Sequence, residues 1–383
     1  MEIMFWASVG IIVYVYLAYP ALIFILAAIK RNPPKLANIT PSVTIIIAAH
    51  NEEEAIAGRV ENCLAQRYPL DKLEIMVASD GSTDRTNEIA GDYQHRYANV
   101  KLLAFTEWQG RAIVHDYAAR EARGEILVFT DAETRFAPDC LQAWMQSFAD
   151  PKVGCVSAQV RYVNTSEGGV SWSEGLYARW EFAISRKESD LGVAFSGFGP
   201  CFAVRRELYE TIAPEHDIDD VLPLRCRKRG YRVVHEPGAI CYDRIAVSQK
   251  AGLRRRIRMS TQGMGATMSE IGWGSFSNPL ALLHVVSRRL LRWWTPFFMI
   301  AAFASNLFLL GSTLYQATLL LQLLFYCAAL IGALLNGLGR KNVILSLASA
   351  FCLANIAFLV SSFNLVTARK VPKYVPTSRH EER

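Results

Sequence analysis

Long runs of uncharged, apolar residues near both ends limit what this chain can fold into. Residues 3–29 carry no charged side chain, and their length is sufficient for a helix to cross a lipid bilayer. Residues 293–339 are also uncharged and are long enough for two crossings with a break near residues 311–313. Residues 342–368 form a further apolar segment. The pattern predicts a membrane protein with a mostly soluble block, about residues 40–274, between the first segment and the others.

Basic residues at the borders of these segments predict the orientation of the chain. Lys30 and Arg31 follow the first segment, and three arginines precede the second: Arg288, Arg289 and Arg292. Because basic residues are retained on the cytoplasmic side, we expect the central block in the cytoplasm and the N-terminus outside the plasma (inner) membrane. The first segment is too long for a cleaved signal peptide and has no basic region before it.

The charges near the C-terminus conflict with a simple crossing pattern. Arg340 and Lys341 precede the segment 342–368, and a basic tail, residues 369–383, follows it. Both are expected on the cytoplasmic side, which is impossible if the segment between them crosses the bilayer completely. One of the C-terminal segments is therefore expected to be re-entrant or interfacial, and the sequence leaves open which one.

Charge and cysteine content argue against several classes of protein. The formal net charge of +6 is concentrated near the membrane borders, where an anionic lipid leaflet explains it better than nucleic acid does. The eight cysteines form no Cys-X-X-Cys pair and fall in the central block or in apolar segments. We therefore expect reduced thiols, without a disulfide framework or a zinc site.

The central block alternates between short apolar runs and amphipathic runs. Strands are predicted at 42–49, 73–79, 100–105, 125–130 and 153–160, with helices at 53–66, 83–97 and 111–122 and another after Pro138. Strands and helices that alternate at this spacing are typical of βαβ units and a largely parallel sheet.

Polar side chains follow three of these predicted strands. The sequences at the three ends are His50-Asn51-Glu52, Asp80-Gly81-Ser82-Thr83-Asp84 and Asp131-Ala132-Glu133. Ligands of parallel sheets bind beyond the carboxyl ends of the strands. Asp131 and Glu133 can face one divalent cation together, and their oxygens suit Mg²⁺ or Mn²⁺. The competing interpretation of such a pair is a turn with a solvated helix cap.

The central block resembles the family 2 glycosyltransferases, which are inverting enzymes that use nucleotide sugars. The matching stretches follow the family's order: VTIIIAAHNEEEAI, LEIMVASDGSTDRT, QGRAIVHDYAAREARGEILVFTDAE, SGFGPCFAVRREL and DIDDVLPLRCRKRGYRVVHEPGAICYD. The membrane layout and the closing VPKYVPTSR resemble bacterial members that build extracellular polysaccharides, related to cellulose, hyaluronan and poly-N-acetylglucosamine synthases. The implied fold class is α/β: a Rossmann-like GT-A domain between one N-terminal and about three C-terminal transmembrane or interfacial helices.

The resemblance implies five parts of the chain. These are an N-terminal transmembrane helix (1–31), the GT-A domain (40–250), interfacial amphipathic helices (251–292), a C-terminal transmembrane region (293–368) and the basic tail (369–383).

The same resemblance assigns residues to the donor side of the site. Asn51 and Glu52 correspond to the segment that lines the nucleotide base, and Asp80 to an aspartate that contacts uridine. Arg111 takes the place of a lysine near the diphosphate. Asp131 matches the first acid of the family's metal-binding Asp-X-Asp motif, whose second position holds Glu133 here. The alternatives are an ordinary Asp-Gly turn after Asp80 and a solvated arginine at a helix start.

A further aspartate is expected to act as the catalytic base. In the family, this aspartate lies six residues before an arginine, and counting back from Arg225 gives Asp219. The adjacent Asp220 is the alternative, and either carboxylate could also cap a helix.

Two stretches are expected to meet the acceptor and the diphosphate. Gly197, Phe198 and Gly199 belong to a stretch that resembles the acceptor-side loop, where glycines allow the backbone to approach a sugar. Its alternative is a tight connection into a strand. Arg255 and Arg258 match a motif that reaches the diphosphate in processive relatives, but Met259 replaces the expected acceptor-stacking tryptophan. That departure leaves processivity open, and this arginine cluster could instead contact lipid head groups.

The predicted function is metal-dependent, inverting transfer of a sugar from a UDP-sugar to a growing polysaccharide or a lipid-linked saccharide. One alternative transfers a single sugar to a polyprenyl phosphate or another lipid. An alternative of another class is a non-catalytic subunit that binds nucleotide sugar in a polysaccharide assembly complex. Membrane lipids and a polysaccharide export or assembly partner are the expected associates, whereas nucleic acid is not.

Overall fold

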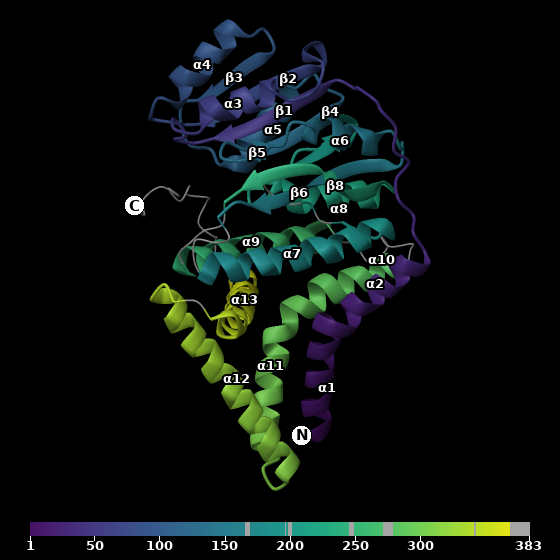
Figure 1. The fold of residues 1–383 in the computed structure, drawn as a ribbon, viewed down its shortest axis with the longest axis vertical. Helices are drawn as coiled ribbons and strands as arrows, with labels where there is room; N and C mark the ends of the chain where they lie inside the picture. Colours follow the sequence, from purple (N-terminus) through teal and green to yellow (C-terminus); the bar gives the residue numbers. More distant parts are fainter. Residues whose placement is uncertain are drawn as a thin grey trace.

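The molecule is layered along its long axis (Figure 1). An α/β domain lies at one end, the long helices α7 (Gly169–Asp190) and α9 (Gln249–Glu270) cross beneath it, and apolar helices extend away from them. The N-terminus lies at the far end of the apolar helices. The computed structural model describes residues 1–164, 169–195, 197, 201–244, 249–270, 279–340 and 342–367.

An eight-stranded sheet of order β3-β2-β1-β4-β7-β6-β8-β5 forms the centre of the α/β domain. Its parallel half consists of β3 (Val100–Phe105), β2 (Leu73–Asp80), β1 (Val43–Ala49) and β4 (Ile126–Asp131). Each of these strands forms within one residue of its predicted range. The helices α3 (Ile56–Leu64), α4 (Thr86–Arg96), α5 (Arg111–Glu121) and α6 (Cys140–Phe148) also form where the sequence predicts helices.

The other half of the sheet is mixed. β7 (Cys201–Arg205) runs antiparallel to β4 and to β6 (Val153–Tyr162), whereas β8 (Arg232–Asp243) runs parallel to β6. The short β5 (Arg135–Phe136) pairs antiparallel with β8. The sequence analysis identified β6 but missed β5, β7 and β8. Pro237 and Gly238 interrupt the apolar pattern of β8, and the pairing with β6 shifts register there, which explains why β8 was missed.

Helices cover both faces of the sheet and bury it. Ile45 and Ile47 of β1 belong to the core shared with α3, α4 and α6, whereas Ile46 belongs to the core shared with α5 and α8 (Ile218–Lys228). This alternation follows from the two-residue period of a strand. Since both faces are covered, ligands can reach the domain at the strand ends.

Two helical stretches bend side by side at the level where the apolar helices begin (Figure 1). One is α1 (Glu2–Val13), η1 (Tyr14–Ala18) and α2 (Tyr19–Ile29); the other is α10 (Pro279–Val285), η5 (Val286–Leu291) and α11 (Arg292–Leu307). Both η1 and η5 are π-helical, which is a recognised cause of bending. A hydrogen bond of 2.7 Å between the hydroxyls of Tyr14 and Ser287 joins the two bends.

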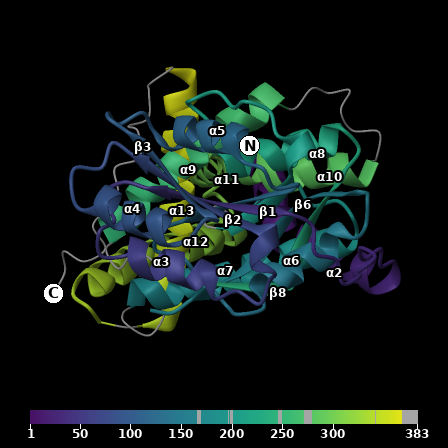
Figure 2. The ribbon, with the colours of Figure 1, turned by 90° about the horizontal axis from the view of Figure 1, so that it is seen from above.

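The C-terminal apolar region contains α12 (Thr313–Gly337) and α13 (Val343–Val366). The helical stretch 2–29, α12 and α13 are each long and apolar enough to cross a membrane. A break between α11 and α12 occurs where the sequence predicts it. Figure 1 shows α13 nearly end-on and Figure 2 shows it along its length, so α13 runs roughly perpendicular to the long axis.

Candidate functional site

The carboxyl ends of β1, β2 and β4 meet at one edge of the sheet, as the sequence predicts. In the parallel register, Ala49 pairs with Ser79, and Ala48 pairs with Asp131. The polar residues that follow these strands are therefore neighbours. Segments that are far apart in the chain deliver Asn51, Asp80 and Asp131 to one place.

The loop after β1 is tied to the loop after β2. Asn51 has a positive φ of 55°, which asparagine tolerates better than most residues, and its Oδ1 accepts a hydrogen bond of 2.8 Å from the backbone N–H of Thr83. The N–H of Asn51 donates to Ser82 Oγ, and the N–H of Glu52 donates to Thr86 Oγ1. These bonds hold the two loops together beside the strand ends.

Asp80 anchors the segment that precedes α5. Its side chain is buried, and its oxygens accept hydrogen bonds of 2.6 Å from the N–H of Gln109 and 2.9 Å from the N–H of Gly110. Gly81 has a φ of 63°, and an added Cβ would lie 2.5 Å from the backbone N of Trp108, so a side chain does not fit there. Asp80 thus positions the start of α5, and its remaining lone pairs can accept a further hydrogen bond.

Arg111, the first residue of α5, reaches the acid at the end of β4. Its Nη2 lies 3.3 Å from Asp131 Oδ1. The preceding Gly110 has a φ of 106°, a conformation that favours glycine, and this turn directs α5 toward the strand ends. The predicted diphosphate-binding arginine and the predicted metal-binding aspartate are therefore in contact.

The donor set at Asp131 and Glu133 fits a divalent cation that also binds phosphate. The cationic Arg111 already lies against Asp131, so this carboxylate faces a position that stabilises positive charge. Burial lowers the pKa of Arg135, and the carboxylates of Glu133 and Glu52 oppose this by favouring its charged form. No group of three histidine, cysteine or acidic side chains suited to a metal occurs among the described residues. Two protein carboxylates, with phosphate oxygens and water, are a common set for Mg²⁺.

Asp219 belongs to the same electrostatic neighbourhood. It lies in the first turn of α8, and burial and Asp217 raise its pKa to about 6. The positive charge of Arg111 opposes this rise, whereas the negative charge of Asp131 adds to it. Asp219 therefore lies close enough to interact electrostatically with both side chains. The N–H of Gly197 donates a hydrogen bond of 3.3 Å to the carbonyl oxygen of Asp219. The acceptor-side glycine and the predicted base are therefore adjacent.

Asp220 has different neighbours from Asp219. An added Cβ on Gly263 of α9 would lie 3.2 Å from Asp220 Oδ1. Burial and the charge of Asp219 raise the pKa of Asp220 to about 8, and Arg289 on η5 opposes that rise. The side chain of Asp220 thus faces α9 and η5, whereas that of Asp219 senses Arg111 and Asp131.

The remaining predicted residues lie on α9 or outside the described residues. Arg255 and Arg258 are partly buried, and Met259 is 43% exposed. Because α9 packs against α8 and α13, these side chains belong to the layer beneath the α/β domain. Phe198 and Gly199 lie outside the described residues. Arg225, the reference point for finding Asp219, binds Glu270 of α9 through Nε at 3.0 Å and Nη2 at 2.8 Å, and so joins α8 to α9.

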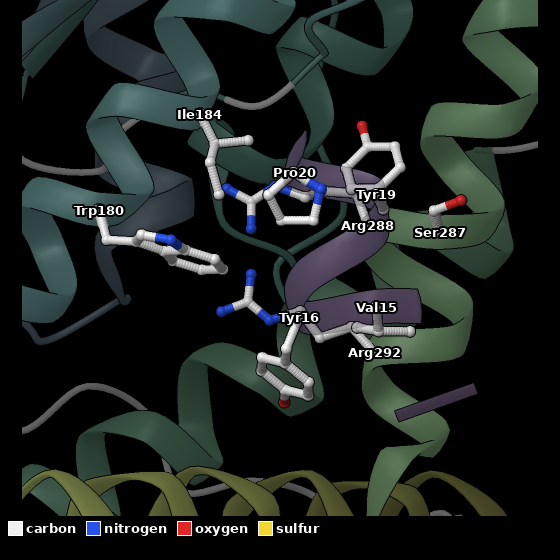
Figure 3. A pocket seen from close by; sticks show the side chains of 9 residues that line it. All are labelled: Val15, Tyr16, Tyr19, Pro20, Trp180, Ile184, Ser287, Arg288 and Arg292. Atoms are coloured by element: carbon white, nitrogen blue, oxygen red, sulfur yellow. The ribbon is translucent and has the colours of Figure 1, made fainter. Parts of the chain in front are cut away.

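A buried polar cluster near the bends was not predicted. The Tyr19 hydroxyl lies 3.0 Å from Glu188 Oε1 and 2.8 Å from His284 Nδ1, and Arg288 Nε lies 3.2 Å from the same Glu188 oxygen. Figure 3 shows a small adjoining cavity, lined by Val15, Tyr16, Tyr19, Pro20, Trp180, Ile184, Ser287, Arg288 and Arg292. The sequence signal that could have indicated this cluster was the group of charged residues, such as Arg288, beside the apolar segments. These contacts hold α2, α7 and η5 together.

Part of the chain matches a known protein family. Residues 44–213 match the family model described as Glycosyl transferase family 2. A probable glycosyltransferase of Bacillus subtilis is 25% identical over 245 residues, which cover 60% of this chain and 57% of that protein. A poly-β-1,6-N-acetyl-D-glucosamine synthase of Staphylococcus aureus is 26% identical over 246 residues, with 62% and 58% covered. The chain thus spans less than two thirds of the length of these relatives.

A solved structure shares the fold over nearly the whole chain. It is a mannosyltransferase from Pyrobaculum calidifontis in complex with GDP-Man and Mn²⁺, which superposes with a TM-score of 0.71 at 23% identity. The match covers 96% of this chain and 99% of the other. Together, these matches show that residues 44–213 form a domain similar to the family 2 glycosyltransferases and that the chain has a GT-A fold, flanked by apolar helices.

Proposed function

We propose that this chain is a membrane-integrated, inverting glycosyltransferase that uses a UDP-sugar and a divalent metal, with its catalytic domain on the cytoplasmic side of the plasma (inner) membrane. The main support is the convergence of Asp219, Arg111 and Asp131 beyond the strand ends: Arg111 contacts Asp131, and the charges of both act on the pKa of Asp219. A base, a cation and a metal-binding acid at one place are the groups that sugar transfer from a nucleotide diphosphate requires.

Each residue has a proposed role in the reaction. Asp219, with a pKa of about 6, is mostly ionised at neutral pH and accepts the proton of the acceptor hydroxyl. Asp131 and Glu133 would hold Mg²⁺ or Mn²⁺, which when bound neutralises charge on the diphosphate. Arg111 supplies a further positive charge beside Asp131. Attack from the side opposite the diphosphate inverts the anomeric centre.

The structure favours Asp219 over Asp220 as the base. Both are in the first turn of α8, but the carboxylate of Asp220 faces Gly263 and the field of Arg289. A base must come within hydrogen-bond reach of the hydroxyl that attacks the donor. The shared field of Asp219, Arg111 and Asp131 supports that position for Asp219.

The proposed acceptor is a growing polysaccharide or a lipid-linked saccharide. The similarity to a poly-β-1,6-N-acetyl-D-glucosamine synthase supports the first, and the adjacent apolar helices are compatible with either. Transfer of one sugar to a polyprenyl phosphate or another lipid is the alternative, and product size distinguishes the two.

The test is release of nucleotide diphosphate by the purified full chain in detergent with added membrane lipid extract. The panel contains UDP-sugars and, because the mannosyltransferase of similar fold was solved with GDP-Man, GDP-sugars. Each is measured with Mg²⁺, with Mn²⁺ and with EDTA. We expect metal-dependent release from one UDP-sugar, loss of release in Asp219→Asn, and full activity in the control Asp71→Asn, which changes an exposed carboxylate. Release that persists in EDTA or in Asp219→Asn would contradict the proposal.

A further inference from the structure

The helix α13 has the length and composition of a membrane span but not the direction of one. It contains 24 residues, none of them charged, and its length is about 36 Å. The helices α1 and α11 extend along the long axis of the molecule, and α12 follows it obliquely (Figure 1). By contrast, α13 lies across that axis directly beneath α9 (Figures 1 and 2).

Contacts at both ends fix α13 in this direction. Near its start, an added Cβ on Gly332 of α12 would clash with the Leu345 carbonyl oxygen, and the Ser346 hydroxyl donates a bond of 2.7 Å to Asn336 Oδ1. Near its end, the Ser361 hydroxyl donates a bond of 3.0 Å to the carbonyl oxygen of Ile257 in α9. The helix thus runs from the end of α12 to the underside of α9.

The side chains of α13 are distributed as in a helix surrounded partly by lipid. Its buried residues are small or polar: Ser346, Ser349, Ala354, Asn355, Ala357 and Ser361. Its exposed residues are apolar: Val343, Ile344, Leu347, Ile356, Phe363 and Val366. Small residues between helices and apolar residues on the outside are typical of membrane proteins, whereas a helix that faces water shows the reverse.

We propose that α13 lies in the plane of the membrane, within the leaflet next to the catalytic domain, with its exposed face against lipid acyl chains. The chain then crosses the membrane with its N-terminal helix, with α11 and with α12, and both ends of α13 lie on the side of the catalytic domain. Arg340, before α13, and Thr367, after it, are then on the same side as Lys30 and Arg31. This arrangement removes the charge conflict that a complete crossing by α13 creates.

The position of α13 also places lipid beside the catalytic helices. An added Cβ on Gly265 of α9 would lie 3.7 Å from Leu365 Cδ2, and Gly263, two residues earlier, lies against Asp220. The end of α13 is therefore separated from the Asp219–Asp220 pair by one helix, α9.

The first experiment measures depth in vesicles of phosphatidylethanolamine and phosphatidylglycerol. Single cysteines are introduced into the full chain after Cys327 and Cys352 are changed to alanine; the other six native cysteines are buried. Ile344→Cys, Ile356→Cys and Phe363→Cys test α13, and Leu314→Cys, Leu324→Cys and Leu334→Cys test α12; all six positions are exposed. Each carries an environment-sensitive fluorophore, which is quenched by lipid nitroxides near the head group or near the acyl-chain end.

The two helices should give different depth profiles. We expect similar depths at the three α13 positions, and on α12 a central position deeper than both ends. A depth maximum at Ile356, matching that at Leu324, would overturn the proposal.

The second experiment compares the sides of the membrane. Leu338→Cys, before α13, and Thr367→Cys, after it, are treated with a membrane-impermeant maleimide in intact cells and in inside-out vesicles. Leu70→Cys in the catalytic domain is the reference, because it is exposed and lies just before β2 of the sheet. We expect all three to react in the same preparation, and reaction of Leu338→Cys and Thr367→Cys from opposite sides would refute the in-plane position. Neither experiment depends on sugar transfer, so loss of the proposed activity would not affect either result.

Discussion

Replacement of Asp219 by asparagine should abolish activity and make the folded protein more stable at alkaline pH. Burial raises the pKa of Asp219 from 3.8 to about 6, with Asp217 contributing, so the folded state holds its proton more tightly than the unfolded state does. A raised pKa means that this group favours the folded state at low pH and that this contribution is lost as pH rises through about 6. At high pH the ionised carboxylate is a cost, which asparagine removes.

The size of the effect follows from the shift in pKa. Each pH unit of difference corresponds to about 1.4 kcal/mol, so the shift from 3.8 to about 6 corresponds to about 3 kcal/mol above the folded pKa. At about pH 4.5 Asp219 is mostly protonated in the folded state and mostly ionised in the unfolded state. The destabilisation caused by its raised pKa is then only about 1 kcal/mol. For a domain of this size, about 3 kcal/mol corresponds to a rise in Tm of about 6 °C or more.

The assay is thermal unfolding of the full chain in detergent, followed by tryptophan fluorescence at about pH 8 and about pH 4.5. Asp219→Asn should raise Tm at the higher pH and raise it by about a third as much at the lower pH. Asp71→Asn, which changes an exposed carboxylate, is the control and should not show this pattern. An equal Tm for Asp219→Asn and the native protein at about pH 8 would refute the claim that burial holds this carboxylate in an unfavourable environment.

Three further predictions concern the neighbours of Asp219. Because Arg111 lowers the pKa of Asp219, Arg111→Gln should move the acidic limb of the kcat/KM profile to higher pH, and an unmoved limb would contradict their coupling. Gly197→Ala places a Cβ 2.9 Å from the Asp219 carbonyl oxygen, so kcat should fall about tenfold or more while circular dichroism stays native. Glu270→Gln removes the charge that binds Arg225 at 2.8 Å, so the free energy of unfolding should fall by about 1–3 kcal/mol, and an unchanged Tm would show that this contact does not stabilise the α8–α9 joint.

Much of the fold was predictable because local patterns and tertiary contacts agree in the first half of the domain. The strands β1 to β4 are apolar runs that end in polar residues, and the helices between them have their own periodicity. The family match and the shared fold confirm the predicted GT-A class. The missed strands β5, β7 and β8 pair with partners distant in sequence, and their short or interrupted patterns give little local signal.

The site was predictable as a set of residues but not as a set of contacts. The motifs indicated Asp131, Arg111 and Asp219, but not that Arg111 would lie against Asp131 or that Asp80 would accept the amides of Gln109 and Gly110. The spacing from Arg225 pointed to Asp219 and left Asp220 as the alternative, but it could not show how their surroundings differ. Their different surroundings arise from α9, η5 and β4, which approach α8 from other parts of the chain.

The sequence by itself determined the α/β fold class and the presence of membrane-length apolar helices. Both follow from local properties: the length of each apolar segment and the polar residues at the strand ends. Uncharged segments of about membrane length require an apolar environment, and acids placed after buried strands must lie at a sheet edge. Only the tertiary structure decided the direction of α13, since hydropathy reports what surrounds a helix and not how the helix is oriented. That direction depends on the contacts of Gly332 and Ser346 between α12 and α13 and of Ser361 with α9, which exist only after the chain has folded.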